Sequence, residues 1–150
     1  MRLSGLNCIV TGGSSGIGAA SVKRFVDEGA KVLIADIDID AANSFAEEMG
    51  SSVDAIKCDV RVESDVKSVS EHGYKIWDKV DVLVNNAGSE LNQTYDKTTL
   101  EEWDRVLDTD LKGPWLMCKH IVPGMVKAGS GSVINISSLN GLVGFPLSTA

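Results

Sequence analysis

The chain has 150 residues, of which 14 are basic and 21 acidic, so its formal net charge at neutral pH is −7. With 43% hydrophobic and 23% charged residues, the composition is that of one globular domain, which excludes a disordered tail or a collagen-like repeat. The acidic balance argues against binding to nucleic acid or to an anionic membrane surface. No apolar run approaches the roughly 18 residues of a membrane span.

The chain start and the cysteines bear on location. The segment from Met1 to Gly5 has one positive charge and leads directly into a strand-like run, which predicts no signal peptide. Cys8, Cys58 and Cys118 are odd in number and widely spaced, as is typical of buried thiols in a reducing compartment rather than of a disulfide framework or a metal site. We therefore expect a cytoplasmic protein without a bound metal.

Short apolar runs alternate with helical patterns along the whole chain. Strands are predicted at Leu6–Val10, Val32–Ala35, Val53–Cys58, Val80–Val84 and Ser132–Ile136. Helices are predicted from the first Gly/Ser cluster to Gly29, at Asp40–Met49, from about Val62 to Trp77, and from about Leu100 to Val126. Parallel strands need such crossovers, so the alternation predicts an α/β fold with a doubly wound parallel sheet.

The fifth predicted strand, Ser132–Ile136, is apolar and would be interior in a complete sheet of this kind. A chain that ends soon after it leaves an unpaired edge and an uncovered face. We therefore expect residues 1–150 to form a domain incomplete at its C-terminal end. On its own, this chain is expected to be prone to aggregation or to depend on further sequence.

A glycine-rich segment, Thr11 to Gly18, joins the first predicted strand to the first helix. Glycines there allow a tight turn and a close backbone approach to a ligand, and the free N–H groups of the helix start favour a phosphate. A merely flexible loop is the alternative. The position after strand one of a βαβ unit favours a dinucleotide-binding, Rossmann-type fold, and the missing Lys-Ser/Thr ending excludes a Walker-type loop. The predicted cofactor-binding residues of this turn are Gly12, Ser14, Ser15, Gly16, Ile17 and Gly18.

Asp36 ends the second predicted strand, 18 residues beyond Gly18, where an acid is expected to bind the adenosine ribose hydroxyls. Its charge would also repel a 2′-phosphate, since two unit charges about 4 Å apart interact by about 4 kcal/mol at an effective dielectric near 20. The neighbours Ile37, Asp38 and Ile39 supply no compensating cation, so NAD is predicted over NADP. The alternative is a solvated acid that caps the next helix, a task that Asp38 or Asp40 could also perform.

At this point the sequence resembles the short-chain dehydrogenase/reductase family, from Leu6 to Ala150. Five motifs in the family's order carry the resemblance: Thr11-Gly12-Gly13-Ser14-Ser15-Gly16-Ile17-Gly18, Asp36, Asp59-Val60, Asn85-Asn86-Ala87-Gly88 and Asn135-Ile136-Ser137-Ser138. The spacing of Gly16-Ile17-Gly18 is similar to that of the short branch of the family, so a relative of the sugar-nucleotide epimerases fits less well.

The resemblance implies further cofactor contacts. Asp59 and Val60 would contact the adenine through a carboxylate and a backbone amide, although Asp59 could equally be a helix cap before Val62. Asn86, Ala87 and Gly88 would line the cofactor pocket at the point where the strand order reverses, where ligands bind in such sheets. A plain Asn-Gly turn is the alternative for this segment.

Ser138 matches the catalytic serine of the family, whose hydroxyl would donate to the substrate oxygen as charge develops there. An ordinary loop serine is the alternative. The family's acid/base residue is a tyrosine, 13 residues beyond the serine, which corresponds to position 151, directly after Ala150. Tyr74 and Tyr95 match neither the motif nor the place. The resemblance therefore implies a chain that carries the cofactor site and the serine but is itself inactive without the residues that follow.

Asp110 matches the position of an active-site asparagine in the family, so the sequence departs from the pattern there. The residue has helical spacing with Trp103, Val106 and Leu107, which predicts a buried acid on an apolar stripe. Pro114 has no N–H and frees the Asp110 carbonyl, which in the family holds a water of the proton relay. A helix kink with a water-satisfied acid is the alternative to a catalytic role.

Taken with the resemblance, these residues predict an NAD(H)-dependent oxidoreductase of a secondary alcohol or ketone. The alternative is a catalytically inactive, truncated nucleotide-binding or interaction module. The expected partners are a small-molecule substrate and further copies of the chain, in a dimer or tetramer built on the region from Trp103 to Val122. The residues expected to shape the substrate pocket are Glu90 to Tyr95 and Leu139 to Phe145.

Overall fold

A computed structural model describes residues 1–148 of the chain. The sheet consists of β1 (Asn7–Thr11), β2 (Lys31–Asp36), β3 (Val53–Lys57), β4 (Val82–Asn85) and β5 (Ser132–Asn135). The helices are α1 (Gly16–Asp27), α2 (Ile39–Met49), α3 (Glu63–Ile76), α4 (Leu100–Leu107) and α5 (Gly113–Ala128). Two short turns of helix complete the order, the π-helical η1 (Asp108–Lys112) and the 3-10 helix η2 (Leu139–Gly141).

All strand pairs are parallel, and the order across the sheet is β3-β2-β1-β4-β5. This confirms the predicted doubly wound α/β fold. The strand order reverses beside β1, because β2 pairs with one side of it and β4 with the other. In such sheets the crevice at the carboxyl ends of the strands flanking the reversal is where ligands bind.

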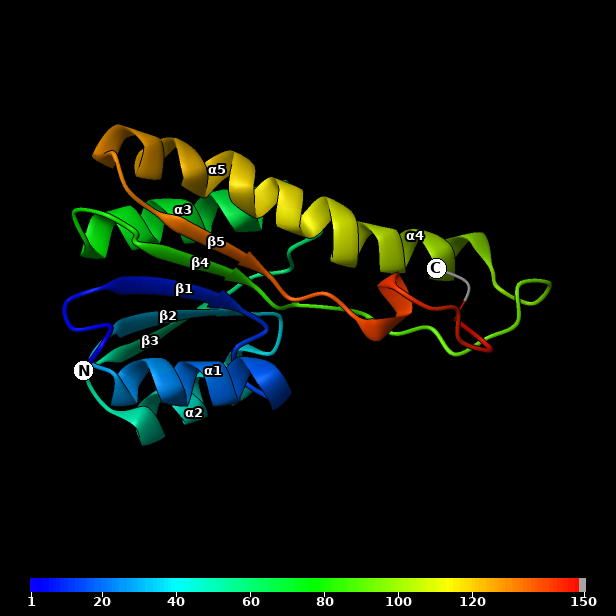
Figure 1. Cartoon of the computed structure of the whole chain (residues 1–150), viewed down its shortest axis with the longest axis horizontal. Helices are drawn as coiled ribbons and strands as arrows, with labels where there is room; N and C mark the ends of the chain where they lie inside the picture. The colour runs from blue at the N-terminus through cyan, green and yellow to red at the C-terminus, as the bar shows by residue number, and fades with distance from the viewer. Residues whose placement is uncertain (149–150) are drawn as a thin grey trace.

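Alternate side chains of the strands build two separate cores, one on each face of the sheet. Figure 1 shows α1 and α2 on one face, with α3 and α5 on the other. Ile9, Leu33 and Leu83 face α3 and α5, whereas Cys8, Val10 and Ile34 face α1 and α2. β2 and β4, which are buried along almost their whole length, are the strands that the sequence shows as continuous hydrophobic runs, as expected of strands covered on both faces.

The long helical region predicted from Leu100 to Val126 is interrupted. The segment Asp108–Lys112 forms a π-helical turn between α4 and α5, in which the Gly113 N–H donates to the Asp108 carbonyl. Pro114 lacks the N–H that an α-helix would offer to the Asp110 carbonyl, so the regular ladder cannot continue there. A π-turn inside a helix is frequent at functional sites.

The strand β5 lies at the edge of the sheet within residues 1–148, beside β4 alone. Its four residues are all exposed, and Val133 and Ile134 keep 37% and 41% of their surface in contact with solvent. Within residues 1–148, no helix is long and apolar enough to cross a membrane. The structure thus contains the unpaired edge and the uncovered face expected from the sequence.

We expect the 150-residue chain to self-associate through β5, because an exposed apolar edge strand is a template for pairing with another chain. Sedimentation velocity at increasing protein concentration measures this as a growing population of large species. Ile134→Lys is expected to reduce the association, since a charge on an edge strand opposes pairing. A monomeric sample that melts cooperatively at every concentration would contradict the prediction.

Candidate functional site

The residues predicted to bind a cofactor lie where the carboxyl ends of the strands meet. The glycine-rich turn follows β1, Asp36 ends β2, Asp59-Val60 follows β3, and Asn86 follows β4. Ser138 comes after β5 at the same edge. Because all strands are parallel, their carboxyl ends meet at this edge, and the fold brings the predicted segments together.

The turn after β1 is fitted closely to its surroundings. Gly12 has a φ of +62°, in the left-handed region, and a Cβ there would lie 3.0 Å from the Ala87 Cα atom. A Cβ on Gly18 would lie 2.0 Å from the Gly12 carbonyl oxygen. The N-cap residue Ser15 makes no side-chain cap hydrogen bond, and the first turn of α1 has no acidic residue. The helix start therefore keeps N–H donors for an anionic group.

Asn86 fixes this turn from across the sheet. Its Nδ2 donates to the carbonyl oxygens of Thr11 and Gly12, at 3.1 and 2.9 Å. The Thr11 hydroxyl in turn accepts from the backbone N–H groups of Asn86 and Ala87, both at 3.0 Å. Both hydrogens of the Asn86 side-chain amide are thus used on the turn, which makes the residue a support of the glycine-rich turn.

Asp36 is 7% exposed and also holds the turn. Its carboxylate accepts from the Ser14 N–H at 3.0 Å and from the Asp38 N–H at 3.1 Å. The helix cap that the sequence left open is Asp38, whose side chain accepts from the Ala41 N–H at the start of α2. A carboxylate offers about four acceptor positions, so Asp36 retains capacity for ribose hydroxyls.

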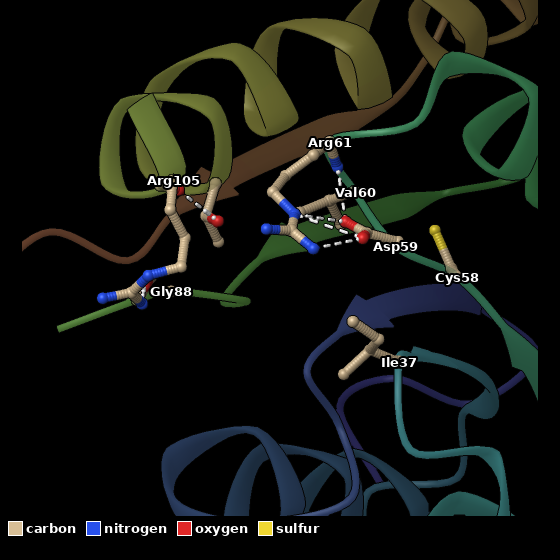
Figure 2. A pocket seen from close by; sticks show the side chains of 9 residues that line it. Ile37, Cys58, Asp59, Val60, Arg61, Gly88 and Arg105 are labelled. Atoms are coloured by element: carbon tan, nitrogen blue, oxygen red, sulfur yellow. Dashed lines mark hydrogen bonds and ion pairs between the residues drawn. The ribbon is translucent and has the colours of Figure 1, made fainter. Parts of the chain in front are cut away.

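An open pocket of about 230 Å³ lies beside these residues, lined by Ile37, Cys58, Asp59, Val60, Arg61, Gly88, Ser89, Arg105 and Thr109. Figure 2 shows the Arg61 side chain folded onto Asp59, with Ile37 on the other side of the opening. Asp59 is not the helix cap: the N-cap of α3 is Val62, and the Asp59 carboxylate faces Arg61 instead. Burial raises the pKa of the Cys58 thiol to about 12, so this cysteine is an inert part of the pocket wall.

The ion pair between Arg61 and Asp59 determines the charge state of the pocket. The Arg61 Nη2 lies 2.6 Å from the Asp59 Oδ2, and Nε lies 2.9 Å from Oδ1. The guanidinium hydrogen bonds hold the pKa of the Asp59 carboxyl below its usual value, against the opposing effect of burial. Asp59 is therefore an ionised acceptor at neutral pH.

The structure places Asp110 differently from the expected buried position. Asp110 is exposed, and Leu111 beside it is 68% exposed. The apolar stripe continues in sequence, but Figure 1 shows that α4 extends beyond the carboxyl ends of the strands, so no sheet lies beneath it there. Partial desolvation still raises the pKa of the Asp110 carboxyl, opposed by the Ser89 N–H and by the charge of Arg105.

Asp110 holds the loop that follows β4. Its Oδ1 accepts from the Ser89 N–H at 2.8 Å. Arg105 donates to the Ser89 hydroxyl and, at 3.2 Å, to the Glu90 carbonyl oxygen. Ser89 and Glu90 are thereby anchored to α4 and η1. Sequence reasoning missed Arg61 and Arg105; the proximity of Arg61 to Asp59 in sequence was a usable signal, whereas nothing in the sequence pattern linked Arg105 to Ser89.

Ser138 is exposed and begins η2, where its hydroxyl oxygen accepts from the Asn140 N–H at 3.2 Å. Among residues 1–148 the hydroxyl has no acceptor of its own, so its hydrogen is available to a ligand. The Gln93 N–H, in the first of the two segments expected to shape a substrate pocket, donates at 2.8 Å to the carbonyl of Leu147, two residues beyond the second segment. Within the same residues, no cluster of His, Cys, Asp and Glu could hold a metal ion.

The fold and its fitted glycine turn define the class as a doubly wound α/β protein with a ligand crevice beside β1 and β4. Residues 7–150 match the family model described as short chain dehydrogenase. The chain belongs to the short-chain dehydrogenase family, which confirms the resemblance and implies a nicotinamide cofactor.

Three relatives illustrate the range of the family. The chain is 37% identical to the 3-oxoacyl-[acyl-carrier-protein] reductase FabG of Thermotoga maritima, over 97% of this chain and 61% of the relative. It is 37% identical to momilactone A synthase of Oryza sativa subsp. japonica, over 95% and 53%. It is also 37% identical to the 3-alpha-(or 20-beta)-hydroxysteroid dehydrogenase of Mycobacterium bovis, over 95% and 55%. The chain thus spans little more than half the length of these relatives.

Proposed function

We propose that the chain is the cofactor-binding part of an NAD(H)-dependent oxidoreductase that acts on a secondary alcohol or ketone. The observation that carries the proposal is the glycine turn, whose backbone is held by Asn86 and whose Ser14 N–H is bound by Asp36. A Cβ on Gly18 would fill this cradle, so the residues present fit a pyrophosphate group at the start of α1. When bound, the nicotinamide cofactor would supply hydride transfer.

In this proposal each segment of the sheet edge has one task. The turn from Gly12 to Gly18 binds the pyrophosphate, Asp36 accepts from ribose hydroxyls, and Asp59 and Val60 recognise the adenine. Asn86, Ala87 and Gly88 form the wall toward the nicotinamide ribose. Ser138 donates its free hydroxyl hydrogen to the substrate oxygen, where negative charge develops during reduction.

Asp110 serves the proposed site in two ways. Its side chain fixes the Ser89 N–H and so the loop that borders the cofactor wall. Its backbone carbonyl, which Pro114 leaves without an α-helical donor, is available to a water in the proton relay. An asparagine at this position would supply the same two acceptors, so the family's side-chain type is not required for either task.

The test of this proposal is the choice between NADH and NADPH. We expect the chain to bind NADH more tightly than NADPH by tenfold or more, because about 4 kcal/mol of repulsion between Asp36 and a 2′-phosphate is only partly screened. Fluorescence titration with both nucleotides measures the ratio. Asp36→Ala is expected to reduce the preference for NADH over NADPH. It should also weaken NADH binding, since it leaves the Ser14 N–H without its acceptor. Equal affinities in the unaltered chain would contradict the Asp36 assignment.

The proposal extends to assembly and location. Apolar side chains lie exposed along α4, η1 and α5, at Trp103, Leu111 and Trp115, which are 38%, 68% and 58% exposed. They support the proposal that the complete protein is a homo-oligomer, and the free buried thiols of Cys8 and Cys58 support a cytoplasmic location. A non-catalytic nucleotide-binding module would share the same cofactor site; the coding sequence beyond Ala150 distinguishes the two, since a tyrosine codon supports the enzyme.

A further inference from the structure

The geometry of the pocket beside β3 involves a residue that the proposed function does not use. Arg61 donates to Asp59 through three nitrogen atoms, its backbone N at 3.0 Å, Nε at 2.9 Å and Nη2 at 2.6 Å. Two of these belong to the guanidinium group, and a paired hydrogen bond of this kind fixes the orientation of the guanidinium plane. The plane is thus set by the protein before any ligand binds.

Hydrogen bonds to Asp59 engage the Nε and Nη2 edge of the guanidinium group, which lines the pocket. The Arg61 side chain is 35% exposed, compared with 19% for Asp59. A guanidinium group is weakly hydrated and stacks well on flat π-systems. Arg61 therefore offers the pocket a flat, cationic surface of fixed orientation.

The opposite side of the opening is apolar. Ile37 is 58% exposed and faces the Asp59–Arg61 pair across the opening in Figure 2, while Val60 is 5% exposed and forms part of the wall behind. A flat ring bound between the exposed Ile37 and the guanidinium group of Arg61 would contact one of them with each of its two faces. The ring would bury the isoleucine side chain and cover the guanidinium face at the same time.

The charges of the pocket argue for a neutral occupant. The Arg61 charge is balanced by Asp59 at hydrogen-bond distance. The guanidinium of Arg105, the other arginine of the pocket, is engaged by Ser89 and Glu90. The side of the pocket formed by Asp59 and Arg61 therefore carries no net charge that would attract a phosphate, whereas a neutral nucleobase needs none.

We propose that Arg61 is a specificity-determining residue of the base pocket, whose guanidinium face, held by Asp59, stacks on the nucleobase opposite Ile37. This inference rests on the proposed function, since it assigns the base of the bound dinucleotide to this slot. Asp59 then orients the arginine that covers the base, through its hydrogen bonds to the guanidinium group.

The experiment compares two fluorescent ligands that differ in the adenosine half, NADH and reduced nicotinamide mononucleotide. Arg61→Ala is expected to weaken NADH binding about tenfold and to leave binding of the mononucleotide within about twofold. Arg61→Lys is expected to weaken NADH binding nearly as much, because lysine keeps the charge but has neither the flat face nor the paired hydrogen bond. Arg24→Ala is the matched control, since Arg24 is an exposed arginine of α1 paired with Glu28.

Thermal unfolding of each variant distinguishes a loss of folded protein from a loss of stacking between Arg61 and the nucleobase. Arg61→Lys provides a second variant, which retains the charge. NADH affinities of both Arg61 variants within twofold of the unaltered chain would overturn the stacking role. Full recovery of affinity in Arg61→Lys would also overturn it, by showing that charge alone matters. Failure of the unaltered chain to bind NADH would overturn the proposed function itself, a result that differs from both.

Discussion

Gly18→Ala is expected to abolish NADH binding and to lower the free energy of unfolding by about 3 kcal/mol, at the upper end for an overpacked site. The added Cβ would lie 2.0 Å from the Gly12 carbonyl oxygen and 2.6 Å from the Asn86 Nδ2. The first of these atoms is backbone and cannot rotate away. The turn must therefore open, which breaks the hydrogen bonds from Asn86 and moves the N–H groups that would hold the pyrophosphate.

Gly16→Ala is the matched control for this prediction. Gly16 has a φ of +53°, but a Cβ there would meet no atom within 4 Å. The substitution should cost only the backbone strain of a left-handed alanine, about 1 kcal/mol. Denaturant unfolding and NADH titration of both variants measure the difference. Equal losses in the two variants would show that conformational freedom, and not the close approach to Gly12, is what the turn requires.

Ser138→Ala is expected to lower kcat/KM by about 10²–10³ in a chain extended to the length of the relatives, because one hydrogen-bond donor to the developing oxyanion is lost. The Ser138 oxygen already accepts from the Asn140 N–H, which leaves the hydroxyl hydrogen to the substrate. Cofactor affinity should change little, since the glycine turn and Asp36 lie on other segments. Rates of NAD reduction with a panel of secondary alcohols, alongside NADH titrations, provide the measurement.

Two comparisons sharpen the serine prediction. Ser137→Ala is the matched control, and its rate should stay close to that of the unaltered extended chain. The 150-residue chain itself is expected to show no turnover, because a base must lie within about 3 Å of the proton it takes and the family's tyrosine would fall after Ala150. Turnover by the 150-residue chain that Ser138→Ala removes would show that another group takes the proton; Asp110, through a water on its carbonyl, would then be the first residue to test.

The parallel sheet was predictable because most of its strands are apolar runs closed by polar or glycine residues, whereas the order of the strands comes from the structure. The boundaries shifted by a residue or two: β4 begins at Val82 rather than Val80 and extends to Asn85. The predicted site segments meet at one edge because parallel topology leaves them no other place. Sequence periodicity could not show where the sheet ends beneath a helix, so Asp110 was wrongly expected to be buried.

The partners of the polar side chains were less predictable, since they depend on rotamers and on distant segments. Asp36 was expected to face a ribose, and its hydrogen bond from the Ser14 N–H was not foreseen from the sequence. Gly113, directly after the π-helical turn at Asp108–Lys112, packs closely against Val60, and a Cβ on Gly113 would lie 2.8 Å from the Val60 Cγ2. Spacing along one helix contains no information about that contact.

The support that Asn86 gives to the glycine turn has a consequence for how the chain folds. The hydrogen bonds from Asn86 to Thr11 and Gly12 join residues 75 and 74 positions apart. Contacts between residues so distant in sequence form slowly, because a long loop must close first. The turn therefore acquires its final shape only after β4 has docked beside β1, even though its own residues are synthesised before those of β4. Recovery of nucleotide binding during refolding should thus follow the pairing of β1 with β4, not the formation of β1 and α1.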